Sequence, residues 1–308
     1  ERTSVLTVKA RRSGAPALEA RAVLRPAVRR LGAVALGFAG GWAVLYGALM
    51  PFGLGLVLGL AEDCFAPCAA GAALGVLLHG FGALSLRSVC LLCALGAAVA
   101  VRWVWPGGFL PAVLAGCGTL AAMGLCFALG TGGGAELALF CTADALLAGL
   151  LGLALRRFPP EKPGFGTLLT GAAVAAALGN LPLERFFPGV AVCAAVELVL
   201  CSRGQPGAAL ACSGMLGAAL CAADPALACG AAGLACGASA ACILAPGRRV
   251  EAAAAYAGGC VAGVLCIQPL AGAFSFLLSA GAGAGLCTLL PAGWLMPALK
   301  EDDPPGDE

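Results

Sequence analysis

Long apolar stretches, separated by short polar or turn-forming clusters, make up most of the chain. From Leu31 to Leu295 apolar residues follow one another in continuous runs and do not alternate with polar ones. A helix rises about 1.5 Å per residue, so a run of about 20 apolar residues crosses the roughly 30 Å hydrocarbon core of a bilayer. Because a chain in lipid must satisfy its own backbone hydrogen bonds, these runs predict membrane-spanning α-helices.

Turn-forming clusters mark the ends of these helices: "PGG" at 106–108, "GTGGG" at 130–134, "FPPEKPG" at 158–164 and "PGRR" at 246–249. The pattern predicts helical segments at residues 31–49, 50–60, 65–80, 88–105, 110–130, 135–155, 165–182, 187–201, 206–222, 225–244, 250–268 and 272–292. Segments 50–60 and 65–80 are short enough to be half-membrane or re-entrant pieces, and Pro51 either splits the first run or lies within it. We therefore predict an all-α, polytopic helical membrane protein with about ten, and up to twelve, transmembrane helices.

The amino-acid composition supports this prediction and also indicates how the helices pack against one another. Hydrophobic residues make up 61% of the 308 residues, charged residues make up 11%, and the mean hydropathy is +0.97. Soluble domains are about one quarter charged, so a soluble fold is excluded. The chain also contains 47 glycines, and small residues throughout the apolar runs indicate thin helices with close Gly/Ala packing.

The distribution of charge predicts the orientation. Residues 1–30 form a basic arm with two acids and eight basic residues, which are Arg2, Lys9, Arg11, Arg12, Arg21, Arg25, Arg29 and Arg30. The positive-inside bias places this arm, and the loops with Arg156, Arg157 and Lys162 and with Arg248 and Arg249, in the cytoplasm. A signal peptide is the alternative for the first run, but thirty residues precede it and no small-residue cleavage site stands out.

These features predict three parts. Residues 1–30 are the basic cytoplasmic arm, residues 31–295 are a multi-spanning transmembrane domain, and residues 296–308 are an acidic cytoplasmic tail or the start of a linker. Both termini are then cytoplasmic, and the protein is a multi-pass protein of the inner (plasma) membrane. The basic arm lacks an aromatic residue for stacking, and orientation explains it without nucleic acid.

One stretch, residues 224–249, is almost free of large side chains, and this predicts an interior or partner-facing helix. Gly230, Gly233 and Gly237 lie near one helical face, and Gly259 and Gly263 repeat the four-residue spacing in the next segment. Glycine pairs four residues apart allow membrane helices to approach closely. We predict helix packing through these glycines, although a chain this rich in glycine also produces such pairs by chance. We also expect the chain to self-associate in the membrane.

Charged residues inside the apolar runs are the candidates for function. Asp144 and Glu197 lie deepest, whereas Arg102 and Glu136 lie within a turn or two of a break. One hypothesis makes Asp144 and Glu197 a cation or proton site of a transporter or permease subunit. The other, which we favour, has Asp144 protonated or hydrogen-bonded to a neighbour and Glu197 reaching Arg203 near its helix end.

The remaining reactive side chains predict no catalytic, cofactor or metal site. The seventeen cysteines lie mostly inside apolar runs, where cysteine acts as a small hydrophobic residue, and we expect Cys64 and Cys68 to be free thiols rather than a pair. The single histidine, His79, excludes Cys/His zinc sets and is interpreted as structural or interfacial. Arg248 or Arg249 is close enough in sequence to pair with Glu251.

Four stretches together resemble a known family. They are "RRLGAVALGFAGGWAVLYGALMPFGLGLVLGL" (29–60), "ADALLAGLLGLALRRFP" (143–159), "LERFFPGVAVCAAVELVLCSRGQPGAALACSGMLGAAL" (183–220) and "GLACGASAACILAPGRRVEAAAAYAGG" (233–259). In order and spacing they resemble the N-terminal membrane region of the stage II sporulation protein E family. The motifs are low in information, since Gly, Ala and Leu dominate them, but they extend over nearly the whole chain.

The resemblance implies a multi-spanning anchor of about ten helices in a Gram-positive endospore former. In that family a phosphatase domain follows, needs Mn or Mg, and activates the forespore sigma factor by dephosphorylating an anti-anti-sigma factor. The anchor is thought to place this serine/threonine phosphatase at the asymmetric division septum beside the tubulin-like division GTPase. No catalytic residue carries over to this chain, which lacks that domain. A transporter, or an assembly scaffold unrelated to sporulation, remains as an alternative.

Overall fold

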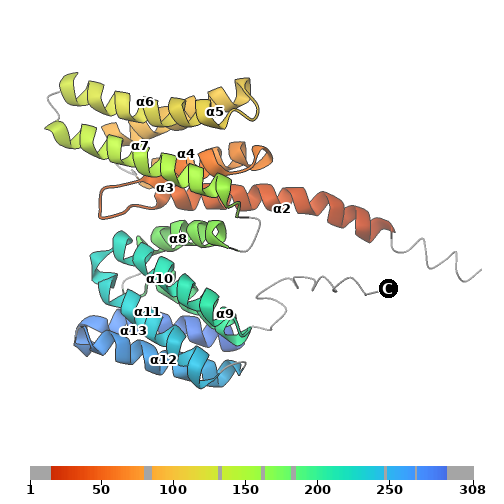
Figure 1. Cartoon of the computed structure of the whole chain (residues 1–308), viewed down its shortest axis with the longest axis vertical. Helices are drawn as coiled ribbons and strands as arrows, with labels where there is room; N and C mark the ends of the chain where they lie inside the picture. Colours follow the sequence, from red (N-terminus) through yellow and green to blue (C-terminus); the bar gives the residue numbers. More distant parts are fainter. Residues whose placement is uncertain are drawn as a thin grey trace, which may run out of the picture. The chain divides into compact units, whose positions relative to one another are not determined.

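The computed structural model describes residues 15–79, 85–130, 134–160, 164–181, 185–245, 248–267 and 269–289. Within these ranges the chain forms twelve α-helices, labelled α2 to α13, one short 3₁₀ turn, η1, and no β-strand (Figure 1). The all-α prediction is therefore confirmed, and a helix occupies each of the twelve predicted segments. The loop at 130–134 lies mostly outside the described residues.

Five stretches of helix are long and apolar enough to cross a membrane: Leu86–Val104, Phe109–Gly130, Ala135–Arg157, Pro206–Ala223 and Pro225–Leu244. Large apolar side chains also lie on the outside of the helices, as Leu139, Leu146 and Leu150 do on α7 (Gly134–Arg157). An apolar exterior over a small-residue interior is the arrangement that lipid favours. The protein is thus a helical membrane protein, and the ten to twelve crossings remain a prediction.

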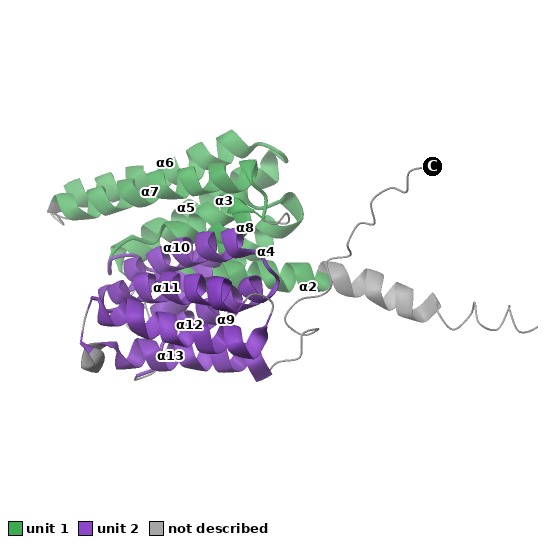
Figure 2. Cartoon of the chain, turned by 60° about the horizontal axis from the view of Figure 1, so that its bottom comes forward, with its two compact units in different colours: residues 1–43, 48–170 green, residues 44–47, 171–308 purple. Residues whose placement is uncertain are grey.

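The described chain divides into two compact units (Figure 2). Unit 1 comprises residues 1–43 and 48–170, and unit 2 comprises residues 44–47 and 171–308. Unit 1 contains α2 (Ala15–Trp42), α3 (Pro51–Gly59), α4 (Glu62–His79), α5 (Leu86–Val104), α6 (Phe109–Gly130) and α7 (Gly134–Arg157). The helices after these are α8 (Phe165–Gly179), α9 (Pro188–Ser202), α10 (Pro206–Ala223), η1 (Pro225–Leu227), α11 (Ala228–Leu244), α12 (Arg249–Leu265) and α13 (Leu270–Leu289).

The first helix differs from its predicted bounds of 31–49 at both ends. It begins at Ala15, within the range predicted for the basic arm, because the alanines, leucines and arginines there are good helix formers. It ends at Trp42, and the chain then turns through Tyr46 (φ 51°) and Gly47 (φ 67°). Two consecutive residues in the left-handed region cannot continue a right-handed helix, so the run that looked continuous breaks before Pro51.

The core of unit 1 is the short helix α3, which is buried from Pro51 to Leu58. Its nine residues rise only about 14 Å, roughly half the thickness of a hydrocarbon core. Around it, α2 and α4 lie side by side, and α6 pairs with both α5 and α7 (Figure 1). A proline at the first helical position starts α3, since proline lacks the N–H that would be unsatisfied there.

Successive helices of unit 1 alternate in direction. One end of each helix after α2, together with Arg29 of α2, lies around a common cavity, as shown by its lining residues Arg29, Leu60, Glu62, Arg102, Gly107 and Arg156. At the other end, Trp42 at the end of α2 meets His79 at the end of α4, with ring centroids 5.5 Å apart. The basic segment before Leu31 and the loop after Arg156 therefore belong to the same end of the unit.

Unit 2 is built around α9, which packs against α10, α11, α12 and α13. Its buried residues include Val190, Cys193 and Leu198. Helix α11 packs between α10 and α12, and its glycine face is buried, as expected for an interior helix. The carboxyl ends of α9 and α11 lie together, since the Sγ atoms of Cys201 and Cys242 are 3.0 Å apart.

Candidate functional site

Asp144, near the middle of α7, is fully buried and binds two residues of unit 1, Met50 and Arg87. Its Oδ1 accepts the backbone N–H of Met50 at 2.8 Å, immediately before α3. Its Oδ2 accepts a hydrogen bond of 3.1 Å from Nε of Arg87 and also forms an ion pair with Nη2 of that residue. The Arg87 guanidinium lies 5.4 Å from the centroid of the Phe140 ring, which helps to hold it in an apolar setting. The carboxylate is thus neutralised where it lies.

Arg102, near the end of α5, occupies the opposite end of α3. Its Nη1 donates to the carbonyl oxygen of Val57 at 2.9 Å and to that of Leu58 at 3.3 Å, and its Nη2 donates to that of Leu60 at 2.6 Å. Only 8% of the residue is exposed, and its guanidinium lies 5.0 Å from the centroid of the Phe65 ring. Arg102 turns toward α3 because the last carbonyl groups of that helix lack partners within the helix.

Asp144 and Arg102 therefore clamp α3 from its two ends. A helix carries partial positive charge at its amino end and partial negative charge at its carboxyl end, so a carboxylate before Pro51 and a guanidinium after Gly59 both stabilise it. Without them, a nine-residue helix would leave unsatisfied N–H and C=O groups inside an apolar core. The amino end of α3 therefore meets Asp144 directly.

Glu197 lies on α9, fully buried in the core of unit 2. Its Oε2 accepts a hydrogen bond of 2.7 Å from the hydroxyl of Tyr256 on α12, which is itself fully buried. Within the described residues Oε1 has no hydrogen-bond partner. The predicted contact with Arg203 is wrong: Arg203 follows the end of α9 and is exposed, whereas Glu197 lies within the helix and points into the bundle.

The other charged candidates lie at helix ends. Glu136, in the first turn of α7, is exposed, as its nearness to a break suggested. Arg248 pairs with Glu251 at 2.9 Å in the first turn of α12, so the predicted contact there is confirmed. Asp144 and Glu197 belong to different units, and each is held by partners from its own unit.

The five packing glycines all lie at helix contacts within unit 2. A Cβ at Gly230 would lie 2.7 Å from the Phe276 ring, and one at Gly233 would lie 2.7 Å from the same ring and 2.8 Å from Val264. At Gly237 a Cβ would lie 2.6 Å from Sγ of Cys260. Added carbons would lie 2.5 Å from the carbonyl oxygen of Cys236 at Gly259, and 2.7 Å from that of Ala232 at Gly263.

Another set of close glycine contacts lies in unit 1 and was not singled out as a site from the sequence. Gly37 and Gly41 of α2 interlock with Gly71 and Gly75 of α4, so that a Cβ at any of the four would overlap a backbone carbonyl oxygen of the other helix. Both pairs have the four-residue spacing. That spacing was the available signal, but nothing in the sequence showed that the two pairs face each other.

The remaining functional partners were also missed. Arg87 and Tyr256 were not recognised because they are 57 and 59 residues from the acids that they bind. Within the described residues the structure contains no disulfide bond, and Cys64 and Cys68 are both buried. In the described part of the chain, no group of three or more His, Cys, Asp or Glu side chains is placed to hold a metal ion.

Comparison of the chain with protein families, with curated proteins and with solved structures found no match.

Proposed function

We propose that this chain is a membrane anchor that positions a cytoplasmic partner domain and carries out no reaction of its own. The observation that supports this most strongly is the clamp on α3, in which Asp144 and Arg102 hold the two ends of one buried helix. Charges that would be available for transport in a permease are used here to satisfy backbone groups. A helical unit whose buried charges are bound in this way is suited to remain rigid in the bilayer.

The proposed topology has ten to twelve crossings with both termini in the cytoplasm. Support comes from unit 1, where the basic segment around Arg29 and the loop after Arg156 meet at one end, in agreement with the positive-inside bias. Four helices, α8 to α11, then separate that loop from Arg248, and α12 and α13 follow. Four crossings between the loop after Arg156 and Arg248, and two crossings after Arg248, return the chain to the cytoplasm each time.

The partner domain that we propose is a sporulation phosphatase of the stage II sporulation protein E type. The support is the resemblance of residues 29–60, 143–159, 183–220 and 233–259. The anchor would then hold a metal-dependent phosphatase at the asymmetric division septum, where it activates the forespore sigma factor. The metal ion, Mn or Mg, belongs to that domain, and the tubulin-like division GTPase is the expected neighbour at the septum.

A fluorescent fusion of residues 1–308, expressed in a sporulating endospore former, tests this proposal. We expect fluorescence at the polar septum, and we expect the coding sequence beyond residue 308 to encode a phosphatase domain. The variant Glu197→Gln keeps an acceptor for the Tyr256 hydroxyl and should localise in the same way. Fluorescence spread evenly over the membrane would contradict septal anchoring and would favour an unrelated scaffold.

A second candidate function is proton or cation transport, and the unpartnered Oε1 of Glu197 favours it. Reconstitution of the purified chain into vesicles with an internal pH dye distinguishes the two functions. As an anchor, the chain should give no more flux than empty vesicles. Flux that appears with the chain and disappears with Glu197→Gln, while the variant keeps its helical circular dichroism, would establish transport instead.

A further inference from the structure

A cavity of about 510 Å³ opens at the end of unit 1 that carries the basic segments. Its size is within the range of small-molecule sites. Its walls come from α2, α3, α4, α5 and α7, with the turns after Trp105 and Phe158 at its edge. Asp144, Glu197 and their partners Arg87 and Tyr256 do not line this cavity. Arg102, which binds the end of α3, does line it.

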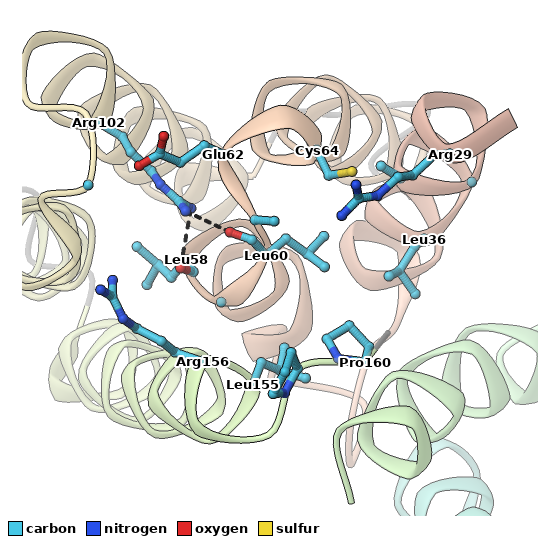
Figure 3. Close-up of a pocket in the computed structure, with 16 residues that line it drawn as sticks. Arg29, Leu36, Leu58, Leu60, Glu62, Cys64, Arg102, Leu155, Arg156 and Pro160 are labelled. Atoms are coloured by element: carbon cyan, nitrogen blue, oxygen red, sulfur yellow. Dashed lines mark hydrogen bonds between the residues drawn. The ribbon is translucent and has the colours of Figure 1, made fainter. Parts of the chain in front are cut away.

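Three arginines from three different helices line this cavity: Arg29, Arg102 and Arg156. Figure 3 shows Arg102 and Arg156 on one side of Leu58 and Leu60, with Arg29 on the other side. The acids nearby are Glu62, which also lines the cavity, and Asp63, which pairs with Arg29 at 2.8 Å. Among the described residues of this cavity, three positive charges face two negative ones, which is an excess of positive charge.

Arg156 is the arginine best placed to bind a ligand. Its guanidinium lies 4.6 Å from the centroid of the Phe109 ring, and within the described residues it meets no carboxylate. Arg102 already donates to three carbonyl oxygens of the α3 end, and Arg29 already binds Asp63. A planar guanidinium with unused donors at the edge of a cavity is suited to bind a phosphate group.

The cavity also has an apolar wall and lies at headgroup depth. Leu36, Leu58 and Leu155 line it beside the arginines. Just after Arg102, Trp103 and Trp105 are 82% and 66% exposed, and exposed tryptophans mark the interface between membrane and water. Phospholipids carry a phosphate group and apolar chains, and their phosphate lies at headgroup depth in the membrane.

We infer that this cavity binds the phosphate of an anionic phospholipid headgroup, with Arg156 as the main contact, Arg29 as a second cation, and the leucine wall along the start of the acyl chains. Basic pockets between membrane helices on the cytoplasmic side recognise lipid headgroups in this way. The inference does not depend on which domain the anchor carries.

Thermal unfolding of the full 308-residue chain in an uncharged detergent, titrated with short-chain phosphatidylglycerol, tests this inference. A ligand that binds only the folded state raises the melting temperature as its concentration rises, so the titration gives an apparent Kd. We expect phosphatidylglycerol to raise the melting temperature well above the effect of the zwitterionic phosphatidylcholine with the same chains. Equal effects of the two lipids would contradict the inference.

The chain offers two matched control pairs. Arg156→Gln and Arg29→Gln remove cations that line the cavity, whereas Arg157→Gln and Arg30→Gln remove neighbours in sequence that do not line it. Loss of one charged hydrogen bond should weaken phosphatidylglycerol binding about tenfold in Arg156→Gln, and less in Arg29→Gln. The controls should bind like the unaltered chain, and all four variants should melt normally without lipid, since these side chains are exposed.

Three outcomes would overturn the inference. Equal losses in Arg156→Gln and Arg157→Gln would indicate only a diffuse attraction between a basic surface and an anionic micelle. Unchanged binding in both cavity variants would place the lipid elsewhere. Stabilisation by inorganic phosphate that depends on Arg156, with none by phosphatidylglycerol, would assign the cavity to a soluble phosphate compound instead of a lipid.

Discussion

At the scale of single residues, two buried charged side chains of unit 1 satisfy backbone groups of α3. Asp144 accepts the N–H of Met50, and Arg102 donates to the carbonyl oxygens at the other end of the same helix. Arg87 completes the arrangement by neutralising Asp144. A buried ion pair adds little stability compared with apolar side chains of the same shape, but removal of one partner leaves an uncompensated charge in an apolar core.

The variant Asp144→Ala should therefore lower the free energy of unfolding by about 3–5 kcal/mol. The loss has two sources, the unpaired Arg87 guanidinium and the unsatisfied N–H of Met50. Glu136→Ala on the same helix is the matched control, since Glu136 is exposed, and its effect should stay within about 0.5 kcal/mol. Unfolding in mixed micelles, followed by circular dichroism, measures both values.

Adding Arg87→Leu to Asp144→Leu should restore part of the lost stability, because no unpaired charge then remains. If the double variant is no more stable than Asp144→Leu alone, the ion pair does not account for the loss.

At the scale of helices, glycine decides which neighbours approach closely. The pairs 37/41 and 71/75 face each other across α2 and α4, the pair 55/59 meets α7, and 233/237 and 259/263 pack α11 and α12. The pair 281/285 on α13 has the same spacing but has open space where a side chain would go. Spacing thus identifies glycines that are able to pack, and only the partner helix decides which of them do.

This difference gives a matched test. The double variant Gly233→Leu and Gly237→Leu forces side chains against Phe276, Val264 and Cys260, and it should lose at least about 2–3 kcal/mol or fail to fold. Gly281→Leu with Gly285→Leu adds the same atoms to the same spacing and should leave the melting temperature nearly unchanged. Equal effects of the two variants would show that helix packing is not the reason for these glycines.

Helices were largely predictable from the sequence, because continuous apolar runs and glycine or proline breaks act locally. The end of α2 was not, since the turn at Tyr46 depends on a left-handed conformation that tyrosine rarely adopts. The partners of the buried acids were also not predictable. Arg87 and Tyr256 reach Asp144 and Glu197 from other helices, and a distant contact of this kind leaves no local pattern in the sequence.

At the scale of the whole molecule, the directions of the helices in unit 1 agree with the pattern of charge along the sequence. In unit 1 the cavity collects one end of α3, α4, α5 and α7, with Gly107 before α6. Trp42 and His79 meet at the opposite end. The short helix α3 therefore returns the chain to the basic end, and the count of segments before Arg156 becomes even.

Fluorescent-protein fusions truncated within unit 1 test this direction. A fusion after Gly107 or after Pro160 should fluoresce, since both residues line the cavity at the end that we place in the cytoplasm. A fusion after His79 should stay dark, because export prevents the fluorescent protein from folding. Fluorescence at His79 together with darkness at Gly107 would reverse the orientation, and equal signals would contradict the alternation.

The clamp on α3 also constrains the order of biosynthesis. The groups that satisfy α3 come from α5 and α7, so they are synthesised after it. Until then, a segment of nine residues is too short to be retained in the bilayer by its own length. We therefore predict that α3 reaches its final position only after α5 and α7 have inserted beside it. A nascent chain stalled before α7 would still expose that segment to the quality-control machinery of the cell.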